Sequence, residues 1–284
     1  MLTFTSSGAV QAPTTVQIRV TRSFPGRVAA GAPAPERSLS DDELRANLRY
    51  FTEGLKGPRT RPCTALVLSG LQLGERDALA NLVAEGRQLG LERVTLHLGR
   101  GDRERFAGSA LSGVVDAVAV TVQQDSDIDD LAALAPLFRT AVLLLDEQTL
   151  PNLPRFTERL AGVGPDRIVF TWPFPPSKPP PAADEVVAKL RAAVAPLLAA
   201  NVGWGVKGLP ACTLGDLSER LWRSGNRWYV DASHQLDRAL LFFPDVVRFG
   251  KDDECRYCSA DARCDGAPEA WLNAGLAGRL KPID

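Results

Sequence analysis

The sequence predicts an α/β protein in which mostly parallel strands curve into a partial (β/α)6 barrel resembling the TIM fold. Short apolar runs alternate with helical segments about six times between residues 16 and 207. Strands that are buried on both faces consist of such runs, and parallel neighbours need helical crossovers. The alternation stops after residue 207, where loops and a cysteine cluster follow. The pattern therefore favours one barrel with a small extension, and a doubly wound sheet is the structural alternative.

The expected strands are short runs rich in Val, Leu, Ile and Ala, with turn residues on either side. They cover residues 16–20, 65–68, 94–98, 117–122, 141–145, 167–171 and 202–206.

The expected helices follow from start signals, stop signals and apolar spacing. Ser40-Asp-Asp-Glu43 has the form of a capping box, so a helix begins there and runs to about Glu53. Gly90 is the stop signal of the second helix, and Asp residues fill the first turn of the fourth. The remaining helices lie between the apolar runs, and the proline-rich stretch 172–181 is irregular. After the first helix, they cover residues 75–90, 103–111, 127–138, 154–161 and 184–200.

Three parts make up the expected chain. Residues 1–15 form a flexible lead-in, residues 16–207 the barrel, and residues 208–284 a Cys-rich extension with little core of its own. A metal site is the usual stabilising element of such a small unit. The sequence has no Gly-x-Gly-x-x-Gly after the first strand and no Walker A motif, which argues against the common nucleotide-binding folds.

Bulk composition bounds the partners and the compartment. The formal net charge of −1 gives no reason to expect a nucleic acid or a membrane surface as a partner. The apolar runs are too short to span a bilayer, and the first residues lack the pattern of a signal peptide. We therefore expect a cytoplasmic protein, in which clustered cysteines indicate a metal before a disulfide.

Cys255, Cys258 and Cys264 have the spacing C-x2-C-x5-C, and Cys212 lies upstream. Four thiolates complete a closed site for Zn²⁺ or for a [4Fe-4S] cluster, and spacing does not distinguish the two. Three free cysteines in a tail are the alternative without a metal. Cys63, before the second strand, is expected to be a small buried thiol and is the reserve fourth ligand should Cys212 be badly placed.

The chain resembles the radical S-adenosylmethionine (radical SAM) superfamily over roughly residues 15–284. The resemblance rests on the strand–helix order, on Ala65-Leu-Val-Leu-Ser-Gly70, on Gln88-Leu-Gly-Leu-Glu-Arg93 before the third strand, and on the tail Cys-x2-Cys-x5-Cys-Asp-Gly. The tail is similar to a shortened SPASM or twitch extension. The resemblance implies a barrel of radical SAM type and one auxiliary [4Fe-4S] cluster held by Cys212, Cys255, Cys258 and Cys264.

The catalytic motifs of that family are missing. Its active members carry C-x3-C-x2-C after the first strand, and this chain has Ser23, Arg27 and Ala30 at the matching positions. Where the family has Gly-Gly-Glu-Pro, this chain has Ser-Gly-Leu-Gln, starting at Ser69. A full SPASM core would also have a cysteine at the position of Pro268. We therefore expect neither binding nor reductive cleavage of S-adenosylmethionine by this chain alone.

The resulting hypothesis is a catalytically silent, radical-SAM-like subunit. It would form a heterodimer with an active radical SAM enzyme, or present a peptide to one for modification. Two alternatives stay open. The strand ends of the barrel, with His97 and Asp146, could carry other chemistry, or the chain could be a structural protein stabilised by Zn²⁺.

Overall fold

The computed structural model describes residues 13–22, 37–53, 62–99, 102–172, 181–222, 226–242, 249–275 and 280–283. The strands are β1 (Thr15–Arg19), β2 (Ala65–Gly70), β3 (Arg93–Leu98), β4 (Ala117–Val122), β5 (Phe138–Leu144), β6 (Arg167–Thr171), β7 (Trp204–Lys207), β8 (Arg227–Val230), β9 (Leu240–Phe242), β10 (Phe249–Gly250) and β11 (Ala267–Pro268). The helices are α1 (Asp41–Thr52), α2 (Asp77–Gln88), α3 (Arg103–Ala107), α4 (Asp125–Ala132), α5 (Leu153–Val163), α6 (Ala183–Ala199), α7 (Ala211–Leu214) and α8 (Glu269–Asn273).

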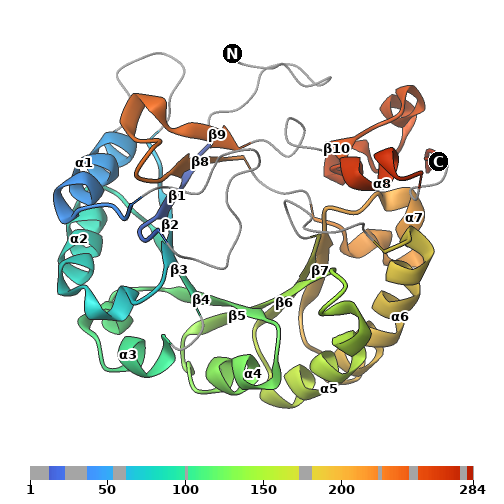
Figure 1. Cartoon of the computed structure of the whole chain (residues 1–284), viewed down its shortest axis with the longest axis horizontal. Helices are drawn as coiled ribbons and strands as arrows, with labels where there is room; N and C mark the ends of the chain where they lie inside the picture. Colours follow the sequence, from blue (N-terminus) through green and yellow to red (C-terminus); the bar gives the residue numbers. More distant parts are fainter. Residues whose placement is uncertain are drawn as a thin grey trace.

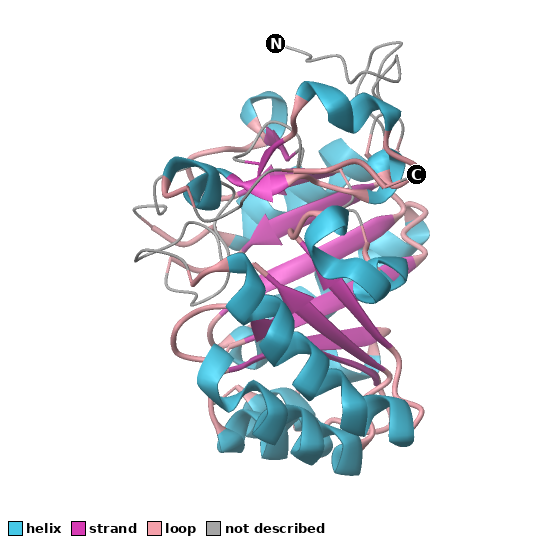
Figure 2. Ribbon diagram, turned by 90° about the vertical axis from the view of Figure 1, so that its right-hand side faces the viewer, coloured by secondary structure: helices cyan, strands magenta, loops and turns pink. Residues whose placement is uncertain are grey.

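The main sheet is mostly parallel and strongly curved. Its described strands number nine, in the order β7-β6-β5-β4-β3-β2-β1-β8-β9, and β9 runs antiparallel to β8. The sheet bends into an arc, and the major helices lie along its outer side (Figure 1; Figure 2). Strands β7 and β9 are its two edges. The architecture is thus α/β and compatible with the expected TIM-like barrel, left open between these edges.

The outer face of the sheet is apolar because it packs against the helices. Ile18, Leu68, Leu96 and Val118 stand beside one another in register, and all four are fully buried. They belong to a core cluster that also contains apolar side chains of α1, α2, α4, α5 and α6. Burial on this scale, at about 25 cal/mol per Å² of apolar area, is the main term stabilising the barrel.

The inner face of the sheet is more polar. Arg19, Ser69 and His97 follow one another in register across β1, β2 and β3. Successive side chains of a strand point to opposite faces, so these residues lie on the concave side, at the carboxyl ends of their strands. This is the side where ligands bind in barrel folds.

The start of α1 has the structure that the sequence predicts. The Glu43 backbone N–H donates to the Ser40 hydroxyl, and the Ser40 backbone N–H donates to the Glu43 carboxylate, which completes the capping box. The fourth helix, in contrast, is shorter than predicted. It ends at Ala132 instead of residue 138, because Pro136 cannot continue a helix and Phe138 already pairs with β4.

Residues that we assigned to the extension add two strands to the barrel sheet. Strand β8 pairs in parallel with β1, and β9 pairs with β8. Strand β8 was not predicted because its inward positions, Arg227 and Tyr229, alternate with the outward ones and leave no continuous apolar run.

The last part of the chain forms what we call the cysteine lobe, comprising residues 249–275 and 280–283. It contains the ribbon of β10 and β11, the 3₁₀ turns η7 (Asp253–Tyr257) and η8 (Asp261–Arg263), and helix α8. The lobe lies beside α7, at the β7 edge of the barrel (Figure 1). The Trp271 ring, fully buried, meets Trp172 at a centroid distance of 4.8 Å, and its Nε1 donates to the Pro181 carbonyl at 2.7 Å.

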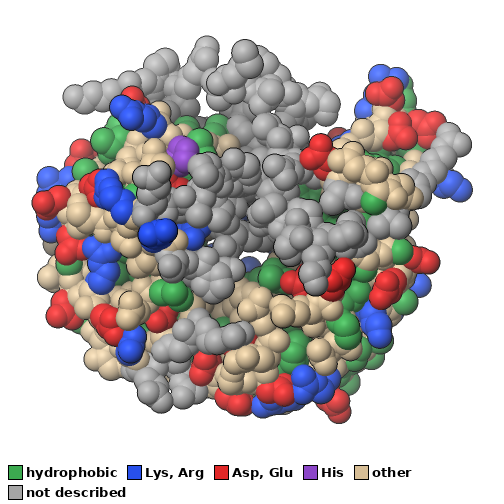
Figure 3. All heavy atoms as spheres, in the orientation of Figure 1, with side chains coloured by type: hydrophobic (Ala, Val, Ile, Leu, Met, Phe, Trp, Pro, Cys, Tyr) green, Lys and Arg blue, Asp and Glu red, His purple; other side chains and the backbone are tan. Residues whose placement is uncertain are grey.

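Charges on the surface are mixed. Acidic and basic side chains alternate over the outer helices on the face shown in Figure 3. No helix within the described ranges combines the length and apolar character needed to cross a bilayer.

Candidate metal centre

Two parts of the chain that are far apart in sequence supply the four predicted cysteine ligands. Cys212 lies in the short helix α7, a few residues after β7. Cys255 lies in η7, Cys258 ends that turn, and Cys264 directly follows η8. Tight 3₁₀ turns bring the lobe cysteines back toward one point, and the packing of the lobe on α7 adds the fourth.

All four cysteines line one small pocket between α7 and the cysteine lobe. Cys264 is buried, and the other three are partly buried. All four are free thiols in the structure. The pocket wall also contains Lys251, Asp261 and Lys281. The sequence singled out these four cysteines as one ligand set, and the fold brings all four to this pocket.

Backbone N–H groups are directed at two of the sulfur atoms. The N–H groups of Ala211 and Gly266 donate to Cys264 Sγ, at 3.4 and 3.3 Å. The N–H of Ile283 donates to Cys258 Sγ at 3.3 Å. Such donors stabilise negative charge on sulfur, and hydrogen bonds to the sulfurs tune iron–sulfur clusters. Two of the four sulfur atoms thus accept hydrogen bonds from the backbone.

Gly266 makes this arrangement possible. Its φ is +97°, and a Cβ there would lie 2.4 Å from the Gly250 carbonyl oxygen. A side chain at this position would push β10 away from the Cys264 turn, so only glycine allows the approach.

The pKa values of the pocket thiols show opposing influences. Burial raises the pKa of Cys255 and that of Cys264, while the Lys251 ammonium acts to lower both. The neighbouring Cys212 thiol adds to both rises. Metal binding needs thiolates, so loading this pocket would release protons and weaken as the pH falls.

The geometry of the free thiols is not that of an assembled site. Among the described residues, no group of three or more His, Cys, Asp or Glu side chains could hold a metal ion as placed. The pocket does, however, contain the ligand atoms that a metal group needs. Four thiols from two segments line it, and backbone N–H groups donate to two of their sulfur atoms.

Cys63 lies elsewhere in the molecule. It precedes β2, is almost fully buried in the main core, and its thiol donates to the Pro13 carbonyl. Burial raises its pKa to about 12. It is not among the residues that line the cysteine pocket. The structure thus places Cys212, and not Cys63, beside the three lobe cysteines.

The other residues that the sequence singled out belong to the segment after β1 and to the strand ends of the barrel. Ser23, Arg27 and Ala30 lie outside the described residues. His97 Nε2 lies 3.0 Å from the Thr121 hydroxyl on the inner face of the sheet. The Asp146 carboxylate accepts the backbone N–H groups of Gln148 and Thr149 and so orders its own turn.

One buried polar cluster on the inner face escaped the sequence analysis. Tyr229, Arg19 and Asp231 are all at least 96% buried, and the charges of Arg19 and Asp231 act on the Tyr229 hydroxyl. Burial, and then the Asp231 charge, raise the pKa of Tyr229. Arg19 also donates to the carbonyls of Thr21 and Arg22, which begin the loop after β1. The signal in the sequence was a charged residue at the end of a strand in which polar and apolar residues alternate.

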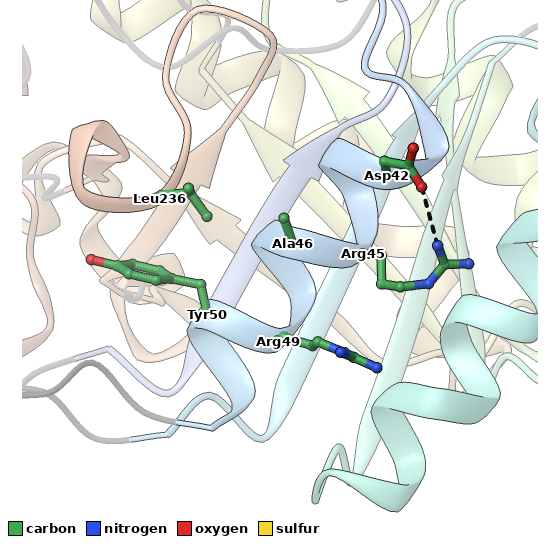
Figure 4. A pocket seen from close by; sticks show the side chains of 6 residues that line it. All are labelled: Asp42, Arg45, Ala46, Arg49, Tyr50 and Leu236. Atoms are coloured by element: carbon green, nitrogen blue, oxygen red, sulfur yellow. Dashed lines mark hydrogen bonds and ion pairs between the residues drawn. The ribbon is translucent and has the colours of Figure 1, made fainter.

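A groove of about 500 Å³ lies on the outside of the barrel, between α1 and the turn η5 (Leu236–Arg238). Tyr50, Ala46 and Leu236 line its apolar part, and Arg45 and Arg49 lie along α1 (Figure 4). Both arginines pair with Glu85. Arg45 also pairs with Asp42, so two carboxylates offset the two positive charges.

Comparison with known proteins gives a likeness in fold. No protein-family model matches the sequence, and no curated protein matches it. Among solved structures, Streptococcus suis SuiB bound to S-adenosylmethionine is similar, with a TM-score of 0.53 and 11% identity over 93% of this chain and 75% of that chain. Another structure of S. suis SuiB has a TM-score of 0.49 and 10% identity, over 70% of this chain and 50% of that chain. The first likeness shows that this chain is similar to SuiB in fold.

Proposed function

We propose that this chain is a non-catalytic, radical-SAM-like subunit that binds one auxiliary [4Fe-4S] cluster. The observation that carries the proposal is the meeting of Cys212 with Cys255, Cys258 and Cys264 at one pocket. Four thiols are the full ligand set of such a cluster, and a set so complete leaves no coordination position for a substrate. The role of the site is then support or electron relay.

The N–H donors on Cys258 and Cys264 favour a cluster held by thiolates, and the pocket lies where the lobe meets the barrel. When bound, a [4Fe-4S] cluster supplies one-electron transfer and a covalent link between these two parts. This chain's own residues hold the ligands in place and shield them from water.

The absence of catalysis by the chain alone rests on the sequence. Ser23, Arg27 and Ala30 offer no thiolate where active radical SAM proteins have three. The fold similarity to SuiB bound to S-adenosylmethionine makes an active radical SAM enzyme, or a peptide that such an enzyme modifies, the natural partner class. The scaffold would then serve to bind and position.

Anaerobic purification with metal and sulfide analysis tests the proposal. We expect about four iron and four sulfide ions per chain, no formation of 5′-deoxyadenosine, and co-purification with a chain that carries C-x3-C-x2-C. The variant C258A should lose iron, and C63A should retain it, because Cys63 lies outside the pocket. One zinc per chain, or 5′-deoxyadenosine made by the isolated protein, would contradict the proposal.

A second candidate is an enzyme that uses the inner face of the barrel for other chemistry. The contact between His97 and Thr121 and the buried Arg19–Tyr229–Asp231 cluster favour it. Asp146 does not, since its carboxylate orders its own turn. Substitution of His97 by Ala tests it: an unchanged cellular phenotype, with the protein folded, would remove this candidate.

A further inference from the structure

Two cations line the cysteine pocket, and the proposed function gives them no role. Lys251 and Lys281 belong to the same pocket wall as the four thiols. They are thirty positions apart in the sequence, at opposite ends of the lobe, so the fold brings them together at this point. Four thiolates around a cluster form an anionic site, and positive charge nearby changes its energetics.

Lys251 is held in place at the pocket. It follows β10 directly, and its Nζ donates to the Asp261 carboxylate at 2.7 Å and to the Asp261 carbonyl at 3.1 Å. Its side chain is 26% exposed, and that of Asp261 is 31% exposed. Two hydrogen bonds to one residue restrict an otherwise flexible ammonium group. Asp261 begins the turn that leads to Cys264, which links the cation to the ligand loop.

Close packing keeps the stem of Lys251 on the same loop. A Cβ at Gly266 would lie 3.0 Å from Lys251 Cγ, so the lysine stem runs directly over the Cys264–Gly266 turn. The position of the lysine and its restraint by Asp261 therefore both keep its charge at the ligand loop.

We propose that Lys251 sets the reduction potential of the cluster held at this pocket, and that Lys281 adds a second positive charge to it. The inference rests on the proposed function. One-electron reduction adds a negative charge to the cluster, so a nearby cation favours the reduced form and raises the potential. Asp261 holds Lys251 and partly offsets its charge. Lys251 is thus a positioning residue that acts through electrostatics.

A redox titration of the full chain tests the proposal. The protein is loaded with iron and sulfide anaerobically, poised at known potentials with dithionite and mediators, and read by electron paramagnetic resonance. In K251Q we expect the ratio of reduced to oxidised cluster at a fixed potential to fall by on the order of tenfold, equivalent to about 59 mV for a one-electron couple. K281Q should shift it in the same direction by less, because no described residue restrains Lys281 at the pocket as Asp261 restrains Lys251.

Matched variants complete the test. K251R keeps the charge and should titrate like the parent chain. K189Q removes a lysine of α6 that does not line the pocket, and it should also leave the potential unchanged. Equal potentials in K251Q and the parent chain would overturn the inference while leaving the proposed function intact. If K251Q does not load, K251M decides, because it removes the same charge and keeps an apolar stem; a potential equal to that of the parent chain overturns the inference. A parent chain that binds no iron overturns the proposed function itself.

Discussion

The barrel and the cysteine lobe are built on different principles. The barrel buries apolar side chains from β1 through β8 and from its helices in one continuous core. In the lobe, by contrast, the fully or nearly buried side chains are few among the described residues, with Trp271 the largest, and its backbone consists mainly of short turns. The barrel is therefore stable through its own packing, whereas the lobe depends on its anchors to the barrel.

Trp271 is the main aromatic contact between the lobe and the barrel, and its removal should give the largest difference in stability between the two regions. In W271A, the lobe loses the contact with Trp172 and the hydrogen bond to the Pro181 carbonyl. We expect a loss of about 3–5 kcal/mol in the local stability of the lobe, measured by hydrogen exchange of residues 249–275. The exchange of β2 to β5 should stay unchanged. L198A, at a 59% exposed position on α6, is the matched control and should have an effect below about 0.5 kcal/mol. Uniform destabilisation of both regions by W271A would refute the division.

The buried thiol of the barrel gives a second contrast, in its dependence on pH. The folded-state pKa of Cys63 is about 12, above the ordinary value of an exposed thiol, so the folded chain keeps a proton that the unfolded chain releases. Its stabilising contribution is complete below about pH 8.5 and falls by about 1.4 kcal/mol per pH unit above that, up to about pH 12. The difference in unfolding free energy between the parent chain and C63A, measured by urea unfolding between pH 8 and 10.5, should show this slope, because the other buried thiols contribute equally in both proteins. Parallel curves would mean that Cys63 is not shielded from water.

A smaller effect is expected at the start of α1, within the barrel. Glu43 accepts hydrogen bonds from Arg37, the Ser40 N–H and Gln235, and the Arg37 guanidinium is the first cause that lowers its pKa. E43Q should cost about 1 kcal/mol at pH 7. The difference from the parent should shrink below about pH 4.3, where protonation begins to remove the same contacts. E53Q, at an exposed position of the same region, should be neutral. The lobe cysteines should react equally with a thiol reagent in all three proteins.

The sequence predicted the elements whose formation is determined by residues close together in the chain. The apolar runs of β2 to β6 and the capping box at Ser40 are readable from neighbouring residues, and both are confirmed. Strand β8 was missed because Arg227 and Tyr229 face inward, which is a property of the barrel and not of the segment.

The cysteine pocket likewise combines a local signal with a contact that depends on tertiary packing. The spacing of Cys255, Cys258 and Cys264 indicated a common site, while the approach of Cys212 depends on how the lobe packs against α7. The meeting of Lys251 and Lys281 at the pocket has no local signal, since it depends on the path of the chain through β10 and back past Cys258.

Hydrogen exchange of the lobe with and without iron and sulfide tests the central claim most directly. Loading the four-cysteine pocket should raise the protection of residues 249–275 by a large factor, because the cluster would tie η7 and η8 to α7, while the strands β2 to β5 exchange as before. Equal protection of the lobe in the loaded and unloaded chain would contradict the claim that these cysteines hold a cluster linking the lobe to the barrel.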